Sequence, residues 1–195
     1  TRRCSTLISR SLARSMNDAG YFTYHHGKRG NTPHEIHRQF ASSRYVDDDA
    51  DRRSGEPGKE IADAAIEFLR ERRGRIAAGG AEKPFFLYLA FANPHDPRIA
   101  AEAYLSRYDV RTVPLPASFA PFHPFDNGEL LVRDEKLAPW PRPEADIRRQ
   151  IREYWAVVTA LDGHIGRILD GLDGVGERER TIVVFASDQG IALGS

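Results

Sequence analysis

The chain has 195 residues, of which 41% are hydrophobic and 29% are charged, as in an ordinary globular domain. Its 28 basic and 28 acidic residues give a formal net charge of zero. Bulk charge therefore provides no argument for a nucleic-acid partner or a charged membrane surface. No apolar run approaches the ~18 residues that a membrane span requires. Cys4 is the single cysteine, which excludes an internal disulfide and a zinc site built from several cysteines.

The sequence has features of truncation at both ends. The chain opens with Thr1, Arg2 and Arg3, without an initiating Met or a signal sequence. It stops at Ser195, a few residues past a predicted strand. We therefore expect residues 1–195 to be part of a longer protein that is truncated at both ends.

Hydrophobic periodicity predicts helices and strands that alternate along the chain. Apolar residues recur at helical spacing in residues 59–73 and 144–172, which are predicted to be the two long helices. Shorter helices are predicted at residues 9–18 and 100–107, and strands at residues 21–25, 84–92 and 181–186. Such alternation is typical of an α/β fold in which helices flank a mixed, largely parallel sheet.

The last predicted strand, residues 181–186, carries the sequence TIVVFA, which is apolar and rich in β-branched side chains. A run of this kind between turn residues is typical of a strand that is buried on both faces, as in a parallel sheet covered by helices. We therefore expect this strand to lie inside the sheet.

Two stretches are predicted to lie outside the core. Residues 32–57 are polar and are expected to be irregular, with residues 47–51 as a solvated acidic run and with His34 and His37 on the surface. Residues 113–143 are rich in proline and aromatic side chains and are expected to form an ordered surface excursion.

Polar residues follow each of the three predicted strands. Lys28 comes after the first strand, His95 after the second, and Asp188 and Gln189 after the third. In open α/β sheets ligands bind just beyond the carboxyl ends of strands, so we expect Lys28, His95 and Asp188 to converge on one sheet edge. Structural interpretations are also open: a solvated loop for Lys28, a satisfied histidine for His95, and a capping turn for Asp188.

These residue types suit hydrolysis of an anionic ester. Asp188 and Gln189 place two oxygen donors side by side, which suits a hard cation such as Ca²⁺ or Mg²⁺. The cation and Lys28 would hold the negatively charged oxygens of the ester. His95 could protonate the leaving group.

Four segments in this order and spacing resemble the sulfatase family of the alkaline phosphatase superfamily. They are AGYFT at 19–23 leading to GK at 27–28, PFFLY at 84–88 leading to PHDP at 94–97, the run 154–169 with LD at 161–162 and IGRIL at 165–169, and TIVVF at 181–185 leading to SDQG at 187–190. The match extends over nearly the whole chain. The resemblance implies that residues 1–195 are a partial sulfatase catalytic domain with an incomplete alkaline phosphatase-like sheet.

The resemblance also implies a function for each strand-end residue. It implies a metal-dependent hydrolase of a small-molecule or carbohydrate sulfate ester, with Lys28 in contact with the sulfate and His95 as a sulfate contact or leaving-group acid. Asp188 and Gln189 would ligate a divalent cation, usually Ca²⁺, and the protein would be periplasmic or secreted. A phosphodiester or phosphonate hydrolase of the same superfamily and a non-catalytic anion-binding homologue remain as alternatives.

Two departures from the sulfatase pattern concern the nucleophile and a histidine of the site. Sulfatases carry a C-x-P-x-R or S-x-P-x-R motif whose Cys or Ser becomes formylglycine, whereas Cys4 stands in CSTLISR and is not assigned as the nucleophile. We expect the nucleophile upstream of Thr1 and the isolated chain to be inactive. Many relatives read G-K-W-H where residues 27–30 read GKRG, and His25 or His26 could replace the missing histidine.

Overall fold

The computed structural model describes residues 10–30, 33–122, 124, 128, 138 and 140–194. The helices are α1 (Leu12–Asp18), α2 (His34–His37), α3 (Asp48–Arg53), α4 (Lys59–Ala77), α5 (Glu102–Leu105) and α6 (Glu144–Gly174), followed by the short 3-10 helix η2 (Arg178–Arg180). The strands are β1 (Phe22–Gly27), β2 (Ser42–Tyr45) and β3 (Phe85–Ala90). Cys4 lies outside the described residues.

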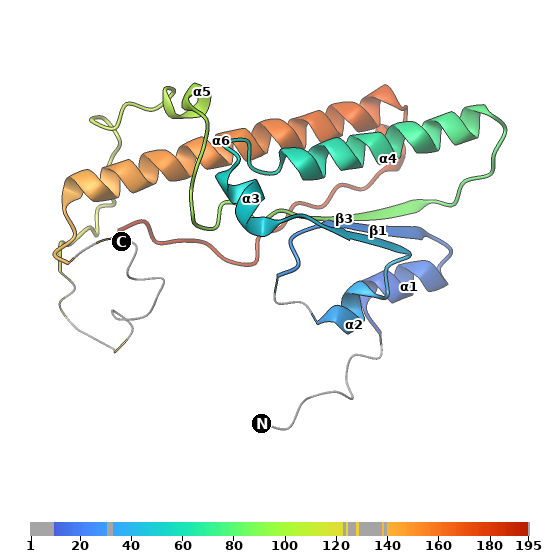
Figure 1. Ribbon diagram of the computed structural model, residues 1–195, viewed down its shortest axis with the longest axis horizontal. Helices are drawn as coiled ribbons and strands as arrows, with labels where there is room; N and C mark the ends of the chain where they lie inside the picture. The colour runs from blue at the N-terminus through green and yellow to red at the C-terminus, as the bar shows by residue number, and fades with distance from the viewer. Residues whose placement is uncertain are drawn as a thin grey trace.

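The three strands form one parallel sheet in the order β2-β1-β3. The long helices α4 and α6 lie on one side of the sheet, and α1 and α2 lie on the other (Figure 1). This arrangement confirms the predicted α/β class with a parallel sheet flanked by helices. In the described part of the chain, no helix carries an apolar run long enough to cross a bilayer.

The elements with strong periodicity are confirmed, with shifts of a few residues at their ends. The predicted long helices are α4 and α6, and the first two predicted strands are β1 and β3. α1 begins at Leu12 because the hydroxyl of Ser11 accepts the N–H of Arg14 and so caps the helix. Residue Ser9, where this helix was expected to begin, lies outside the described residues.

Alternation along β1 directs its side chains to the two faces of the sheet. Phe22 and Tyr24 stack on Phe68 of α4, with ring centroids 5.9 and 5.2 Å away. Thr23 points to the opposite face, where its hydroxyl donates to the side-chain oxygen of Asn17 in α1 at 2.9 Å. β1 is therefore central to the packing of both layers of helices.

His25 lies in an aromatic cluster on the face of the sheet opposite α4. Its side chain is 0% exposed, and its ring stacks on that of His37 with centroids 4.6 Å apart. The rings of Phe40, Tyr45 and Tyr88 surround it. Burial, helped by the neighbouring His37, lowers the pKa of His25 to about 4. His25 is therefore neutral at pH 7.

α4 packs between the sheet and α6 through small side chains. Ala62 and Ala65 of α4 are fully buried against Ile168 of α6, and Leu89 and Phe91 from the β3 side close the same cluster. Alanines on this face let the helix axes approach closely, so that the long apolar side chains of α6 reach the layer above the sheet.

Two glycines of α6, Gly163 and Gly166, do not lie at a close contact with α4. A Cβ added at Gly163 or Gly166 would meet no atom within 4 Å. At Gly171 such a Cβ would lie 3.3 Å from the side chain of Ile66 in α4. Close contact between α4 and α6 therefore depends on Gly171.

Residues 32–57 are more ordered than predicted, because α2, β2 and α3 all lie in this stretch. Asp47 caps α3 by accepting the backbone N–H groups of Asp49 and Ala50. Asp51 is buried, so the acidic run is not uniformly solvated. The prediction that His37 lies on the surface is wrong, because His37 is buried with its Nδ1 2.7 Å from the hydroxyl of Tyr45.

The predicted buried strand at residues 181–186 is absent from the sheet. The segment is extended but pairs with no strand in the described residues, and Ile182 and Phe185 are 92% and 78% exposed. A strand forms only where a neighbouring backbone can accept and donate its hydrogen bonds. The prediction of a buried strand at residues 181–186 is therefore wrong for this structure, because the segment pairs with no strand in the described residues and its side chains are exposed.

The expected surface excursion at residues 113–143 begins in the core. Val113 is buried with Ile147 and Ile151 of α6, and Leu115 and Phe119 pack against them. Val113 is therefore anchored in the core, and the proline-rich stretch begins from that buried residue. Residues 123, 125–127, 129–137 and 139 of this stretch lie outside the described residues.

Gly27 allows β1 to approach β3 closely. Its φ is 143°, and a Cβ there would lie 2.1 Å from the carbonyl oxygen of Ala90. The next residue, Lys28, donates its N–H to that same oxygen at 2.7 Å. Only a residue without a side chain can occupy position 27 while this bond is kept.

We expect Gly27→Ala to destabilise the fold by about 2 kcal/mol or more, through backbone strain and a clash with Ala90. Gly163→Ala is the matched control, since its methyl group meets nothing and should stabilise α6 by about 0.5–1 kcal/mol. Urea unfolding followed by circular dichroism measures both changes. Equal stabilities for the two variants would contradict the close approach of β1 and β3.

The stability of the protein should fall on acidification because of His25. Its folded pKa of about 4 lies below the ordinary 6.5, so the unfolded chain binds this proton more readily between those values. The contribution is complete above pH 6.5 and is lost as pH falls toward 4, by at most about 3 kcal/mol. Burial also lowers the pKa of His26 and of His37. Protonation of these two histidines should therefore lower the stability further as pH falls.

Urea unfolding across this pH range tests the effect in the wild type and in His25→Phe, which keeps an aromatic ring but does not titrate. The free energy of unfolding should fall less steeply with acidification in the variant. Parallel curves for the two proteins would refute the assignment to His25.

Candidate active site at the carboxyl ends of β1 and β3

Lys28 and His95 lie at the same end of the sheet. Lys28 directly follows β1, and His95 comes a few residues after β3, which is the parallel neighbour of β1. The hydrogen bond from the Lys28 N–H to Ala90 joins the two strand ends. The structure thus brings two of the three predicted strand ends to one edge.

The ammonium group of Lys28 is open to a ligand. The residue is partly exposed, and no hydrogen bond or ion pair holds its Nζ within the described residues. The neighbouring Arg29 instead lies over the ring of Tyr45, 5.9 Å from the centroid. A lysine without a carboxylate partner at a strand end is suited to bind an anion.

The imidazole of His95 is held on its Nδ1 side. Nδ1 lies 3.0 Å from Oδ1 of Asp96 and 2.9 Å from the carbonyl oxygen of Asp96. Nη1 of Arg52, from the last turn of α3, lies 3.2 Å from the same nitrogen. The His95 side chain is 41% exposed, so the ring is accessible to a ligand.

Asn93 is a buried polar residue beside His95 in the sequence. It is 5% exposed, and neither its side-chain oxygen nor its nitrogen has a hydrogen-bond partner in the described residues. Buried amides normally have partners. The carboxyl end of β3 therefore presents hydrogen-bonding capacity that a ligand or another segment of protein could use.

Asp188 and Gln189 follow residues 181–186, the third predicted strand. Both are exposed, and the segment before them does not join the sheet. The carboxylate of Asp188 has no partner within the described part of the chain, while the carbonyl oxygen of Gln189 accepts the Ser187 hydroxyl at 2.6 Å. No contact in the described residues connects Asp188 with Lys28 or His95.

Asp188 and Gln189 carry suitable oxygen ligands for a calcium ion, but two residues are too few to complete its coordination shell. Carboxylate and amide oxygens are suitable donors, but Ca²⁺ takes about 6–8 oxygen ligands. Within the described residues no group of three or more His, Cys, Asp or Glu side chains could hold a metal ion. Asp188 and Gln189 could thus supply only part of a coordination shell.

His25 and His26 both belong to β1 and point to opposite faces of the sheet. His25 lies in the aromatic cluster, and Nε2 of His26 lies 3.8 Å from Oε1 of Glu60 on the α4 side. Both rings are buried. Neither histidine lies beyond the strand end, where Lys28 and His95 are found.

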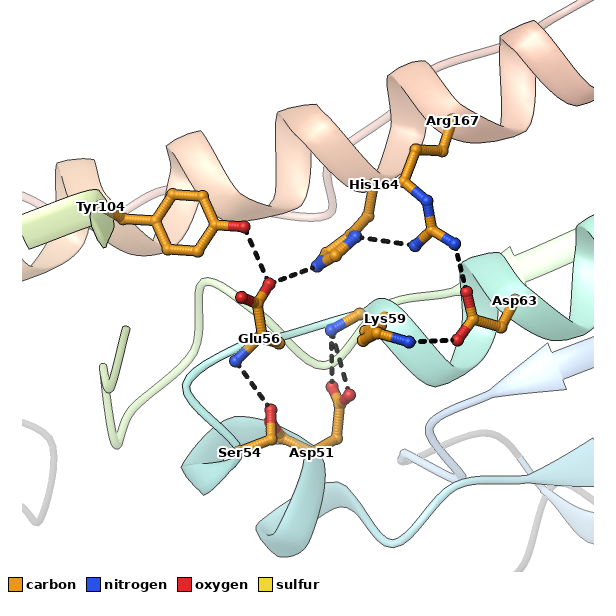
Figure 2. Close-up of polar contacts among 9 residues, drawn as sticks. Asp51, Ser54, Glu56, Lys59, Asp63, Tyr104, His164 and Arg167 are labelled. Atoms are coloured by element: carbon orange, nitrogen blue, oxygen red, sulfur yellow. Dashed lines mark hydrogen bonds and ion pairs between the residues drawn. The ribbon is translucent and has the colours of Figure 1, made fainter. Parts of the chain in front are cut away.

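A polar network connects the segment between α3 and α4 to α6 (Figure 2). Oε2 of Glu56 accepts the Tyr104 hydroxyl at 2.8 Å and lies 3.1 Å from Nε2 of His164. Nδ1 of His164 lies 3.2 Å from Nη1 of Arg167, and Nη2 of Arg167 pairs with Asp63 of α4. Because a guanidinium only donates, Nδ1 of His164 accepts and the His164 proton is on Nε2, facing Glu56.

Asp51 and Gly58 hold the same segment from the side of the sheet. The carboxylate of Asp51 accepts the Gly58 N–H at 3.0 Å, and burial raises the Asp51 pKa, an effect that this bond partly offsets. A Cβ at Gly58 would lie 2.8 Å from Cδ1 of Phe91, just past β3. α3 is thereby held near the end of β3, where Arg52 reaches His95.

A large groove lies elsewhere on the molecule. It has a volume of about 1290 Å³ and is lined by residues that include His26, Arg44, Glu60, Asp63 and Arg167. None of Lys28, His95, Asp188 and Gln189 lines it. Because the groove contains none of the predicted site residues, we assign the candidate site to the strand ends rather than to this groove.

Arg52, Asp96 and Asn93 were not predicted as site residues. Asp96 and Asn93 are near neighbours of His95 in the sequence, so their positions at a strand end could have singled them out. Arg52 is 43 residues away from His95 in the chain. No sequence signal distinguishes it from the adjacent Arg53.

The sulfatase family profile matches residues 4–195. The multifunctional alkaline phosphatase superfamily protein PehA of Trinickia caryophylli is 28% identical over 149 residues, which cover 70% of this chain and 29% of that protein. Human iduronate 2-sulfatase is 27% identical over 150 residues, covering 71% and 26%. The arylsulfatase of Clostridium perfringens is 28% identical over 138 residues, covering 71% and 27%.

The chain thus spans less than a third of the length of these relatives. The family match covers almost the whole chain, the sheet is parallel and flanked by helices as the sulfatase resemblance implied, and a lysine and a histidine follow two adjacent strands. On this evidence, the chain belongs to the sulfatase family.

Proposed function

We propose that the protein carrying this chain hydrolyses sulfate esters at the sheet edge where Lys28 and His95 lie. The observation that supports this most directly is the placement of both residues at the ends of adjacent parallel strands in a chain of the sulfatase family. Relatives named iduronate 2-sulfatase, arylsulfatase and choline-sulfatase support a sulfate ester as the substrate class.

Lys28 and His95 would act on opposite parts of the ester. The ammonium of Lys28 would hold the non-bridging sulfate oxygens as negative charge shifts in the transition state. His95 would transfer a proton from Nε2 to the bridging oxygen as the bond from sulfur to that oxygen breaks, so that the leaving group departs as a neutral alcohol.

The remaining machinery would come partly from outside the described residues. We propose a formylglycine nucleophile there, since Cys4 lacks the sulfatase motif. Asp188 and Gln189 would ligate a divalent cation, most simply Ca²⁺, together with further ligands. The ion would supply positive charge for the nucleophile and the sulfate oxygens.

A phosphodiester or phosphonate ester is the second candidate substrate class. The relative named multifunctional alkaline phosphatase superfamily protein favours it, because that name is not restricted to sulfatases. A lysine and a divalent cation can bind phosphate oxygens as well as sulfate oxygens. Parallel assays with 4-nitrophenyl sulfate and bis-4-nitrophenyl phosphate on the intact protein distinguish the two classes.

Lys28→Ala in the intact protein should lower kcat/KM for 4-nitrophenyl sulfate by about 10²–10³-fold, as loss of one charge-stabilising donor does elsewhere. The matched control is Arg29→Ala, which removes the adjacent cation that lies over Tyr45. Steady-state kinetics on both variants measure the difference. A loss for Arg29→Ala as large as that for Lys28→Ala would assign the effect to general positive charge instead of to Lys28.

Asp188→Ala should cost far more activity than Gln189→Asn, because it removes both a ligand and the charge that balances the cation. Turnover against added Ca²⁺, normalised to the folded fraction, and calcium binding by titration calorimetry measure the effect in the intact protein. If Asp188 only caps a turn, its loss costs ~1 kcal/mol of stability and leaves calcium affinity unchanged. That result would remove Asp188 from the metal site.

A further inference from the structure

We propose that Asp96 and Arg52 position the imidazole of His95, so that its Nε2 faces the ester. The inference depends on the proposed role of His95 and extends it, because it assigns functions to two residues that have none in that proposal. Asp96 follows His95 in the chain, and Arg52 reaches it from α3.

One donor and two acceptors surround Nδ1 of His95. The carbonyl oxygen and Oδ1 of Asp96 lie 2.9 and 3.0 Å from it, and Nη1 of Arg52 lies 3.2 Å from it. A ring nitrogen carries either one proton or one lone pair in the ring plane. Nδ1 can therefore donate to Asp96 or accept from Arg52, but it cannot do both.

Donation from Nδ1 to Asp96 satisfies all three groups. Nη1 of Arg52 then donates to the carbonyl oxygen of Asp96 at 3.1 Å, and the carboxylate of Asp96 faces an N–H group. The opposite assignment would set the Nδ1 lone pair against a carboxylate oxygen 3.0 Å away. The proton of neutral His95 is therefore on Nδ1, and the lone pair is on Nε2.

This arrangement prepares Nε2 for proton transfer. A proton taken up at Nε2 can pass to the leaving oxygen, and the positive ring that carries it faces the Asp96 carboxylate. The side chains of His95 and Asp96 are 41% and 23% exposed. Ion pairs at such exposure add little to stability, so we expect the contact to act on ring orientation rather than on folding.

Arg52 is itself held in place, whereas its neighbour points elsewhere. Nε of Arg52 donates to the carbonyl oxygen of Asp48 at 2.9 Å, one turn earlier in α3. Nε of Arg53 donates to Asp49 at 3.0 Å on the surface. Two adjacent arginines of one helix therefore provide a test residue and a matched control.

The test compares Asp96→Ala, Asp96→Asn, Arg52→Ala, Arg52→Lys and the control Arg53→Ala in the intact protein. ¹⁵N shifts of the His95 ring, identified by their loss in His95→Ala, report which nitrogen carries the proton. Steady-state kinetics use phenyl sulfate and 4-nitrophenyl sulfate, because the poorer leaving group, phenol, depends more on the acid. Should Arg52→Ala fail to fold, Arg52→Lys and Asp96→Asn carry the comparison.

We expect Asp96→Ala and Arg52→Ala to lower kcat for phenyl sulfate by about 10- to 100-fold, with a smaller loss for 4-nitrophenyl sulfate and a smaller change in KM. The Nδ1 proton should be depleted in Asp96→Ala. Asp96→Asn and Arg52→Lys should recover part of the loss, since each keeps an acceptor or a donor. Arg53→Ala should resemble the wild type.

Two results would overturn the inference. One is activity for the Asp96 and Arg52 variants equal to that of Arg53→Ala, and the other is reduced activity with unchanged ring-nitrogen shifts. Failure of the proposed function has a different signature, because the wild type would then cleave neither sulfate ester. The ring-nitrogen shifts would still decide whether Asp96 and Arg52 position His95.

Discussion

The close approach of β1 to β3 at Gly27 is the constraint on which the candidate site depends. The missing side chain lets the Lys28 N–H reach the Ala90 carbonyl oxygen, and this bond brings the ends of the two strands together. Parallel strands deliver their carboxyl ends to the same edge. A residue with a side chain at position 27 would force the strands apart where Lys28 leaves the sheet, and His95 would then follow a displaced strand.

The junction between α3 and α4 is the second support of the site. It is held by buried or partly buried polar contacts, in which Glu56 lies between Tyr104 and His164, and Asp51 accepts the N–H of Gly58. Such contacts contribute modestly to net stability, but leaving any of these buried groups unpaired is costly. Their main effect is therefore to fix the position of α3. Their contribution to the free energy of unfolding is small by comparison. The ring of His95 is oriented from this helix, through a contact between residues that are far apart in the chain.

The extended segment at residues 181–186 shows how an apolar pattern depends on its surroundings. Its large side chains are exposed, and β3 also has a free edge within the described residues, because β1 pairs with it on one side only. Exposed apolar side chains are costly in water, and an unpaired strand edge is a template for pairing with another segment. The described residues therefore leave the outer edge of β3 and the apolar segment 181–186 without a strand partner, in a chain that spans less than a third of the length of its relatives.

The sequence by itself determined the elements whose pattern is local. Helical spacing of apolar residues indicated α4 and α6, apolar runs indicated β1 and β3, and their order placed Lys28 and His95 just past two strand ends. Only the tertiary structure decided the properties that depend on distant partners. Residues 181–186 stay outside the sheet although β3 has an unpaired edge, because no local pattern encodes which strands pair with one another. His37 and Asp51 are buried, and Arg52 rather than Arg53 reaches His95, because packing between segments far apart in the chain sets their surroundings.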